Sequence, residues 1–116
     1  MLFICYPKCS TCKKAKNWLD EHKIEYIERH IVEDNPKYDE LKDWYKKSKM
    51  PLKKFFNTSG NLYKELQLKD KLLNMNDEER LKLLATNGML VKRPIIIKDD
   101  TILIGFKEEE WMEQLL

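Results

Sequence analysis

No stretch of this sequence stays apolar for long, and this excludes one class of protein at once. None of its runs reaches the roughly 18 continuous apolar residues that a membrane-spanning helix needs. The apolar segment 1–5 is also too short for the apolar region of a signal peptide, and no basic run precedes it. We therefore expect a cytoplasmic protein, in a compartment where glutathione and thioredoxin keep thiols reduced.

An excess of charge of one sign is also missing. The 22 basic and 20 acidic side chains leave a net charge of only +2. Proteins that bind nucleic acids usually carry a basic patch or stripe, so the composition does not indicate direct nucleic-acid binding. With 42% hydrophobic residues among 116, the chain can build one core and has little room for a second. We expect a single domain over 1–116.

Cysteine is scarce, and the three cysteines all fall in one short segment, as Cys5, Cys9 and Cys12. A structural disulfide framework would spread its cysteines along the chain so that they join distant parts. Clustered thiols in a reducing compartment fit reactive or metal-binding cysteines better.

The first part of the chain has the pattern of a strand, a helix and a second strand. The apolar run 2–5 predicts a buried strand, and Tyr6-Pro7 predicts the turn that ends it. From Cys9 to His22, apolar side chains recur at spacings of three and four, which indicates one face of a helix. Residues 24–27 alternate apolar and charged side chains, as a half-buried strand does. Together these segments predict a parallel βαβ unit with a right-handed connection.

The middle of the chain, 34–88, is expected to be a helical insert. Helical spacing occurs in 38–45 and in 62–73, and the segment 57–61 between them is rich in turn-forming residues. The acidic residues after Asn76 predict the start of a further helix that runs through Leu84 and that Gly88 would end.

The last part of the chain is expected to return to strands. The runs 94–97 and 101–104 are rich in β-branched residues and predict a hairpin, with its turn at Asp99-Asp100. A final helix would follow Gly105, with Trp111, Leu115 and Leu116 on its inner side. The resulting order, βαβ, helical insert and ββα, defines an α/β fold.

The spacing of Cys9 and Cys12 is the strongest functional signal. Cys9 follows a strand and opens a helix, where the backbone N–H groups of Ser10, Thr11 and Cys12 lack partners within the helix. These groups and the helix dipole favour an anion, so we expect them to stabilise a Cys9 thiolate, and Lys8 adds positive charge. Cys12 lies one helical turn further on, so the pattern predicts Cys9 as the nucleophile and Cys12 as the resolving thiol. The neighbours expected to contact the substrate are Lys8, Ser10 and Thr11.

Two other interpretations of the cysteines remain open. Free cysteines are commonly buried core residues, and Cys5 at the end of a strand fits that description. The three thiols could also bind zinc, with His22 or His30 as a fourth ligand. Structural zinc sites usually have two spaced pairs of ligands, and the second pair is missing here, so we predict no metal site.

A βαβ–ββα order with a C-x-x-C helix resembles the thioredoxin fold. This resemblance implies a four-stranded mixed sheet with the helical insert between strands two and three. It also implies that Pro94 is cis, faces the cysteine pair and presents its backbone to an extended substrate. Arg93 would then lie beside the Cys9 thiolate, where a guanidinium can stabilise the sulfur or bind an anion.

Three segments together resemble the ArsC/Spx family more specifically, and they are 6–14, 62–66 and 93–96. This family comprises glutaredoxin-coupled arsenate reductases, Spx transcriptional regulators and uncharacterised relatives. The resemblance covers nearly the whole chain and implies three candidate activities.

The first candidate activity, which the residues favour, is that of a thiol–disulfide oxidoreductase. It needs only Cys9, Cys12 and Pro94, binds no cofactor, and implies glutathione or thioredoxin as electron donor, with glutaredoxin or thioredoxin as partner. The second is a glutathione-dependent arsenate reductase, in which Cys9 and Arg93 would act on the oxyanion. Two further arginines of such enzymes correspond to positions near Asn57 and Phe106 here, and neither residue can replace a guanidinium.

The third candidate activity is that of an Spx-like redox switch, which implies the α subunit of RNA polymerase as a partner. The Cys9–Cys12 pair and the segment 92–94 fit this interpretation. Spx proteins carry a glycine for the polymerase contact, however, and the corresponding segment here is Lys49-Met50-Pro51-Leu52. The sequence therefore favours a thiol partner over the polymerase.

Overall fold

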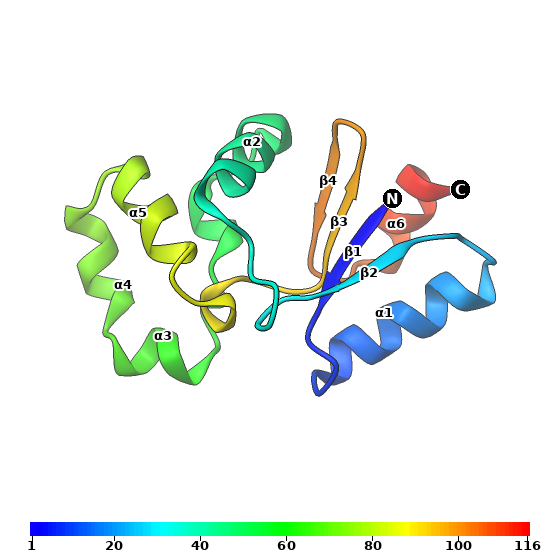
Figure 1. The fold of residues 1–116 in the computed structure, drawn as a ribbon, viewed down its shortest axis with the longest axis horizontal. Helices are drawn as coiled ribbons and strands as arrows, with labels where there is room; N and C mark the ends of the chain where they lie inside the picture. The colour runs from blue at the N-terminus through cyan, green and yellow to red at the C-terminus, as the bar shows by residue number, and fades with distance from the viewer.

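The computed structural model describes all 116 residues and contains one four-stranded sheet with helices on both faces (Figure 1). The strands are β1 (Leu2–Cys5), β2 (Ile27–His30), β3 (Ile95–Lys98) and β4 (Thr101–Ile104). They lie in the order β2-β1-β3-β4, with β1 parallel to β2 and antiparallel to β3, and with β3 antiparallel to β4. The predicted thioredoxin-like mixed sheet, with helices between strands two and three, is confirmed.

Two helices cover one face of the sheet, and the insert lies on the other side (Figure 1). The first two are α1 (Ser10–Glu21) and α6 (Glu108–Leu115). The insert contains α2 (Tyr38–Ser48), α3 (Asn61–Glu65), α4 (Leu68–Lys71) and α5 (Asp77–Leu84), with 3₁₀ turns at Leu52–Phe55, Leu72–Asn74 and Gly88–Leu90. None of these helices is long and apolar enough to cross a membrane.

The alternation of side chains along the strands divides the core in two. On β1, Phe3 and Cys5 pack with residues of α1 and α6, whereas Ile4 packs with residues of the insert. Both faces of β1 are fully buried, since Phe3 and Ile4 are each 0% exposed. A shift of one residue in the pairing would exchange the two faces, so burial on both sides fixes the register of β1.

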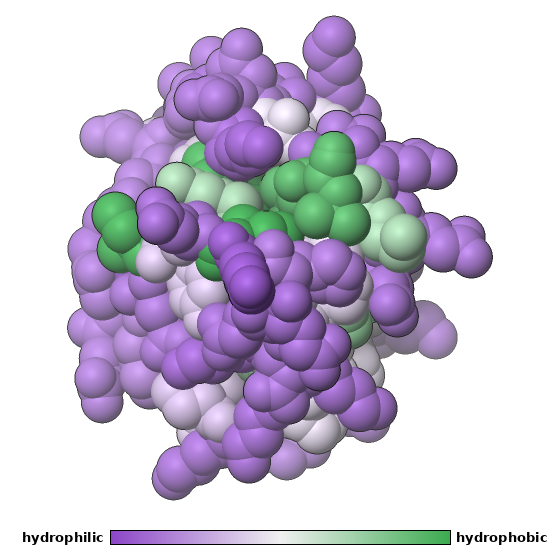
Figure 2. Space-filling view, turned by 90° about the vertical axis from the view of Figure 1, so that its right-hand side faces the viewer, coloured by the Kyte–Doolittle hydropathy of each residue, from purple (hydrophilic) through white to green (hydrophobic).

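Side chains on one flank of the molecule are mostly hydrophilic. Figure 2 shows this flank, which carries α1, β2 and α6, with one apolar area among hydrophilic residues. Ile27, at the start of the edge strand β2, is 71% exposed, and Met112 on α6 is also exposed. Isolated apolar side chains of this kind are normal on a protein surface.

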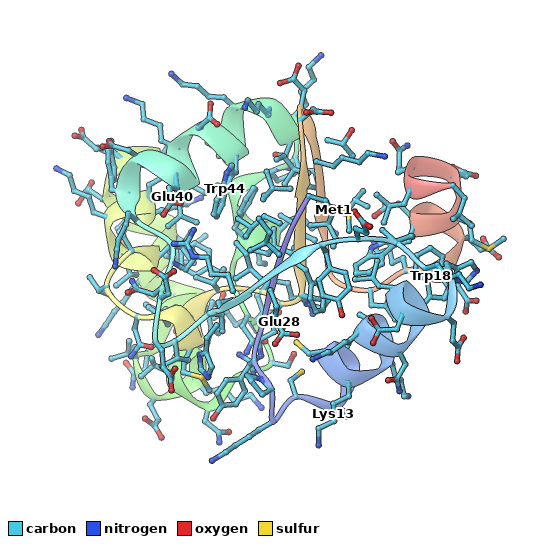
Figure 3. The ribbon with its side chains drawn as sticks, turned by 45° about the vertical axis from the view of Figure 1, so that its right-hand side comes forward. Met1, Lys13, Trp18, Glu28, Glu40 and Trp44 are labelled. Atoms are coloured by element: carbon cyan, nitrogen blue, oxygen red, sulfur yellow. The ribbon has the colours of Figure 1, made fainter.

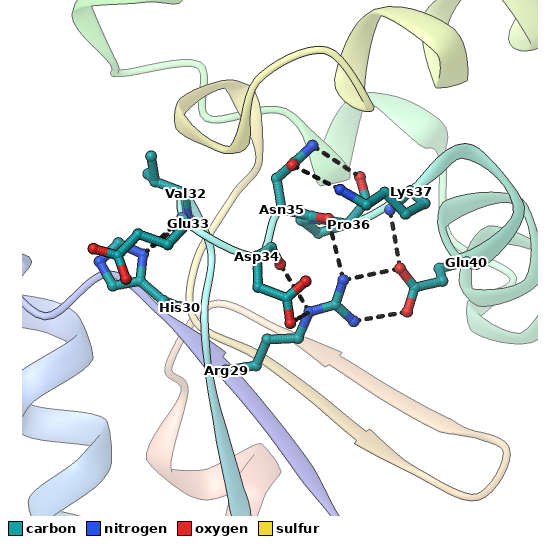
Figure 4. A network of polar contacts seen from close by, with 9 residues as sticks. All are labelled: Arg29, His30, Val32, Glu33, Asp34, Asn35, Pro36, Lys37 and Glu40. Carbon is teal, nitrogen blue, oxygen red and sulfur yellow. Dashed lines mark hydrogen bonds and ion pairs between the residues drawn. The ribbon is translucent and has the colours of Figure 1, made fainter.

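Arg29 of β2 joins the sheet to the insert (Figure 4). Its guanidinium donates to both carboxylate oxygens of Glu40 on α2, at 2.7 and 2.9 Å. It also donates to the backbone carbonyls of Asp34 and Asn35, at 2.8 and 3.1 Å. Arg29 is only 12% exposed, so this bidentate pair is screened less than a surface ion pair. The hydrogen bonds from Arg29 lower the pKa of the Glu40 carboxyl.

A second attachment of the insert consists of backbone hydrogen bonds. Phe56 and Val91 form an isolated antiparallel bridge. On either side of it, the Lys92 N–H donates to the Phe55 carbonyl and the Asn57 N–H donates to the Leu90 carbonyl, both at 2.8 Å. The segment before Pro94 is therefore held directly against the insert.

Two predicted elements have different bounds in the structure. The second strand was expected at 24–27 but covers Ile27–His30, because ladder pairing starts only where the Ile27 N–H donates to the Met1 carbonyl. The helix expected over 62–73 is broken at Gln67, whose φ of 55° is left-handed. In a continuous helix Tyr63 and Leu68 would lie about 140° apart, and the break brings both into the insert core.

The predictions for Gly88 and Leu116 were wrong. Helix α5 ends at Leu84 as predicted, but Gly88, four residues further on, is not the residue that ends it. Gly88 is needed for another reason: a Cβ atom there would overlap the carbonyl oxygen of Ile31. On α6, Trp111 is fully buried as predicted, but Leu116 is 62% exposed because it follows the last helical turn.

We expect Gly88→Ala to destabilise the fold by about 3 kcal/mol, because the backbone around Ile31 would have to move to admit the methyl group. Urea unfolding of both proteins measures the difference. Gly60→Ala is the matched control, since its new Cβ would mainly meet the movable side chain of Asn57. Equal losses in the two variants would contradict the close-approach argument.

Glu40→Gln is expected to cost about 1–2 kcal/mol at neutral pH, because it replaces a charge-assisted pair with Arg29 by neutral hydrogen bonds. Since the folded-state pKa of Glu40 is lowered, its contribution is complete above the unfolded value of about 4.3 and is lost as the pH falls through the folded-state value. The gap in unfolding free energy between wild type and variant should therefore shrink in acid. Glu78→Gln, in an exposed pair with Lys82, is the control and should change little.

Candidate active site

Cys9 lies at the junction between β1 and α1. The chain turns after β1 through a hydrogen bond from the Cys9 N–H to the Tyr6 carbonyl, at 2.9 Å. Cys9 is then the N-cap of α1, with extended backbone angles and a half-buried side chain. The N–H groups of Ser10, Thr11 and Cys12 have no acceptor within the protein. The N-cap position thus brings the Cys9 side chain next to unpaired donors and the positive end of the helix dipole.

Cys12 is buried, with 2% of its surface exposed, and belongs to the same core cluster as Cys5, against which Cys9 packs. Its Sγ accepts the Tyr6 N–H at 3.3 Å. Hydrogen bonding with Cys5, and then burial, raise the pKa of the Cys12 thiol well above its usual range. Cys12 is therefore a protonated thiol at neutral pH and a poor first nucleophile.

A broad cleft of about 1060 Å³ opens between Cys9 and the insert. We call it the Cys9 cleft, and Thr11, Asn57, Arg93 and Phe106 are among the residues that line it. Cys12 and Pro94 are buried and do not contribute to its lining, whereas Lys8 and Ser10 are exposed outside it. Of the predicted site residues, the cleft brings together Cys9, Thr11 and Arg93.

Arg93 lines the wall of this cleft, and one nitrogen of its guanidinium is unpaired. The peptide bond between Arg93 and Pro94 is cis, as predicted. The Arg93 guanidinium lies over the ring of Tyr6, with its Cζ 5.2 Å from the ring centre. Its Nη1 is buried and has no hydrogen-bond partner. A buried guanidinium nitrogen without a partner is costly, so an anion bound beside it would be stabilised.

The sequence did not reveal the positive charge that collects in the Cys9 cleft. Five basic side chains and one acidic side chain, Glu110, line it. The basic ones are Lys53, Lys54, Lys92, Arg93 and Lys107. They come from three separate segments, and the near-neutral composition hides their convergence. Asn57 and Phe106 also line the cleft. The two positions at which the resemblance to arsenate reductases implies further arginines therefore both lie in the Cys9 cleft.

The histidines lie in other surroundings than a zinc site. His22 stacks on Trp18, with 4.2 Å between the ring centres. The Nδ1 atom of His30 accepts the N–H groups of Val32 and Glu33, both at 3.1 Å (Figure 4). No group of three or more His, Cys, Asp or Glu side chains is arranged to hold a metal ion.

Comparison with known proteins agrees with this geometry. The model of the ArsC family matches residues 5–114. The uncharacterized protein YusI of Bacillus subtilis is 52% identical over 97% of this chain and 96% of its own length. The global transcriptional regulator Spx 2 of Bacillus cereus is 33% identical over 88% of this chain and 76% of its own. A solved structure, a possible arsenate reductase from Streptococcus mutans, is 42% identical with a TM-score of 0.88 and covers 96% of both chains.

These likenesses extend over nearly all of the chain. They include the segment 6–12 with Cys9 and Cys12, which we call the cysteine turn, the cis-proline loop at Arg93-Pro94, and the insert. The resemblance to the ArsC/Spx family inferred from the sequence is confirmed. The chain belongs to the ArsC family.

Proposed function

We propose that this protein is a thiol–disulfide oxidoreductase in which Cys9 attacks the substrate and Cys12 resolves the intermediate. The observation that carries this proposal is the different placement of the two thiols. Cys9 is the cysteine that lines the Cys9 cleft, whereas Cys12 touches Cys9 from a buried position. A substrate can therefore reach the first sulfur, and the second is protected until an intermediate forms.

The proposed cycle exchanges sulfur–sulfur bonds in two steps. The Cys9 thiolate attacks one sulfur of a substrate disulfide, forms a mixed disulfide and releases the other half as a thiolate. Cys12, giving its proton to the released thiolate or to water, then attacks the Cys9 Sγ and expels the rest of the substrate. The substrate gains two electrons and the Cys9–Cys12 disulfide holds the oxidation. Two glutathione molecules or one thioredoxin dithiol would reduce it again.

The charge of the Cys9 cleft supports an anionic substrate. Arg93 offers a buried nitrogen without a partner, and lysines on both sides add positive potential. The volume of about 1060 Å³ far exceeds what a single oxyanion fills. We propose a disulfide whose attached groups carry carboxylates, such as a mixed disulfide of glutathione.

Arsenate reduction is a second candidate function, and the free Arg93 guanidinium favours it. The oxyanion would bind between Arg93 and the N–H groups at the start of α1, within reach of Cys9. Against it stand Asn57 and Phe106, which give the cleft no second guanidinium. Polymerase binding, as in Spx regulators, is not proposed, since Met50 and Pro51 replace the glycine that the resemblance implies.

We expect Cys9 to react with iodoacetamide near neutral pH faster than free N-acetylcysteine, and faster than Cys5 or Cys12. The unpaired N–H groups around Cys9 stabilise its thiolate, whereas the other two thiols are 2–3% exposed. Mass spectrometry of timed samples gives the three rates. Cys12→Ser serves as a control that leaves Cys9 labelling intact. If Cys9 reacts no faster than N-acetylcysteine, the nucleophile is assigned wrongly.

Arg93→Ala is expected to lower kcat/KM for a glutathione mixed disulfide about tenfold, which corresponds to loss of about 1.4 kcal/mol of charge-assisted binding. The uncharged hydroxyethyl disulfide should be affected much less. Lys46→Ala, which removes an exposed lysine outside the cleft, is the control and should behave as wild type. An equal loss for both disulfides would contradict the role of Arg93 in binding the anion.

A glutaredoxin-coupled assay that offers arsenate beside the two disulfides separates the two candidate functions. Turnover of disulfide without arsenate turnover supports the first function. Turnover of arsenate that disappears in Arg93→Ala supports the second.

A further inference from the structure

The three cysteines lie close together, since Cys5 and Cys12 belong to one core cluster and Cys9 packs against it. Hydrogen bonding with Cys5 raises the pKa of the Cys12 thiol, and the interaction with Cys9 lowers it. Hydrogen bonding with Cys12 lowers the pKa of the Cys5 thiol. Cys5 comes from the end of β1, Cys9 from the cap of α1 and Cys12 from the first turn of α1. The Cys12 sulfur therefore has both other cysteines as neighbours.

Cys9 and Cys5 face different openings. Cys9 lines the Cys9 cleft, whereas Cys5 and Cys12 line a separate cavity of about 150 Å³. Glu28 on β2 and Lys13 on α1 lie around this second cavity (Figure 3). The ammonium of Lys16, 2.8 Å from Glu28, completes its rim. The Cys5 thiol is thus 3% exposed but is next to a polar opening that the substrate cleft does not share.

We propose that Cys5 is a third redox-active thiol, which takes over the disulfide from Cys9 and leaves a Cys5–Cys12 bond. The proposal rests on the proposed function, because that function supplies the Cys9–Cys12 disulfide. In the exchange, Cys5 loses its proton and its sulfur attacks the Cys12 Sγ. The Cys5–Cys12 bond forms, the Cys9–Cys12 bond breaks, and Cys9 leaves as a thiolate that can take up the proton. No electrons are gained or lost overall.

The surroundings of Cys9 favour this direction of exchange. Thiol–disulfide exchange is faster and more complete when the leaving sulfur is stabilised as a thiolate. Cys9 leaves at the N-cap of α1, beside the unpaired N–H groups of Ser10 and Thr11. The bond that remains lies between two buried sulfurs, and Cys9 is free again in the cleft.

Tryptic peptides distinguish the two disulfides directly. Cleavage after Lys8 and Lys13 separates peptide 1–8, which contains Cys5, from peptide 9–13, which contains Cys9 and Cys12. A Cys9–Cys12 bond stays within the second peptide, whereas a Cys5–Cys12 bond links the two. Wild-type protein is oxidised with a limiting amount of hydroxyethyl disulfide, quenched in acid at intervals, alkylated and digested.

We expect the internal bond of peptide 9–13 to appear first and the linked peptides to follow, with fragmentation placing the link at Cys12. Cys5→Ala should lose the linked species and keep Cys9 blocked against alkylation, whereas wild type regains a free Cys9. Cys9→Ser, oxidised with diamide, should form the Cys5–Cys12 bond directly, and this variant leaves both buried thiols in place.

Two other outcomes contradict the transfer of the disulfide from Cys9 to Cys5, which we call the relay. Oxidised wild type that retains only the Cys9–Cys12 bond refutes the relay and leaves the proposed function intact, even if Cys9→Ser forms the link. If wild type never forms a Cys9–Cys12 bond, the proposed function fails together with the relay, and a link in Cys9→Ser then shows only that the buried thiols are close.

Discussion

The burial of β1 on both faces is the constraint on which the rest of the structure depends. Ile4 must face the insert while Phe3 and Cys5 face α1 and α6, so the strand has one acceptable register. That register pairs Ile4 with Ile95 in the antiparallel strand β3. The residues before β3 then run beside those after β1, and this explains why Arg93 lies over the ring of Tyr6. Core packing therefore sets the distance between the cis-proline loop and the cysteine turn.

The same arrangement gives three chemically similar side chains three different surroundings. Cys5 ends a core strand, Cys12 faces the core from the first turn of α1, and Cys9 precedes that turn at the cap. Hydrogen bonding with Cys5 and burial raise the pKa of the Cys12 thiol, whereas Cys9 lines the open cleft at the helix end. The order of reaction that we propose follows from where each sulfur stands relative to one strand and one helix.

Much of the fold could be predicted because local signals agreed with the tertiary structure. The strand at 2–5 is a short apolar run, the helix after Cys9 has a period of three to four, and the hairpin at 95–104 is rich in β-branched residues. Asn76 caps α5 as its sequence indicates, with its side chain accepting the Glu79 N–H at 2.8 Å. The cis bond at Pro94 followed from a resemblance to known folds, not from any local pattern.

The features that could not be predicted depend on contacts between distant segments. Gln67 breaks a helix because the core needs two side chains that one helix face cannot supply. Gly88 is required by the Ile31 carbonyl, more than fifty residues away along the chain. The lysines of the Cys9 cleft converge from segments with no common motif, and the contact of Cys5 with Cys12 needs the strand and the helix to be packed first. The periodicity of the sequence contains no information about which distant segments come into contact.

The bridge between Phe56 and Val91 also affects how readily this protein could acquire new substrates. Because its two hydrogen bonds use backbone groups, they do not depend on which side chains the neighbouring positions carry. Lys53, Lys54 and Asn57 line the cleft from this anchored segment. Selection or design can therefore exchange these side chains while Arg93 and the cysteine turn keep their places. In the function that we propose, the scaffold thus separates the residues that recognise the substrate from the residues that react with it, so specificity can diverge without a cost to the chemistry.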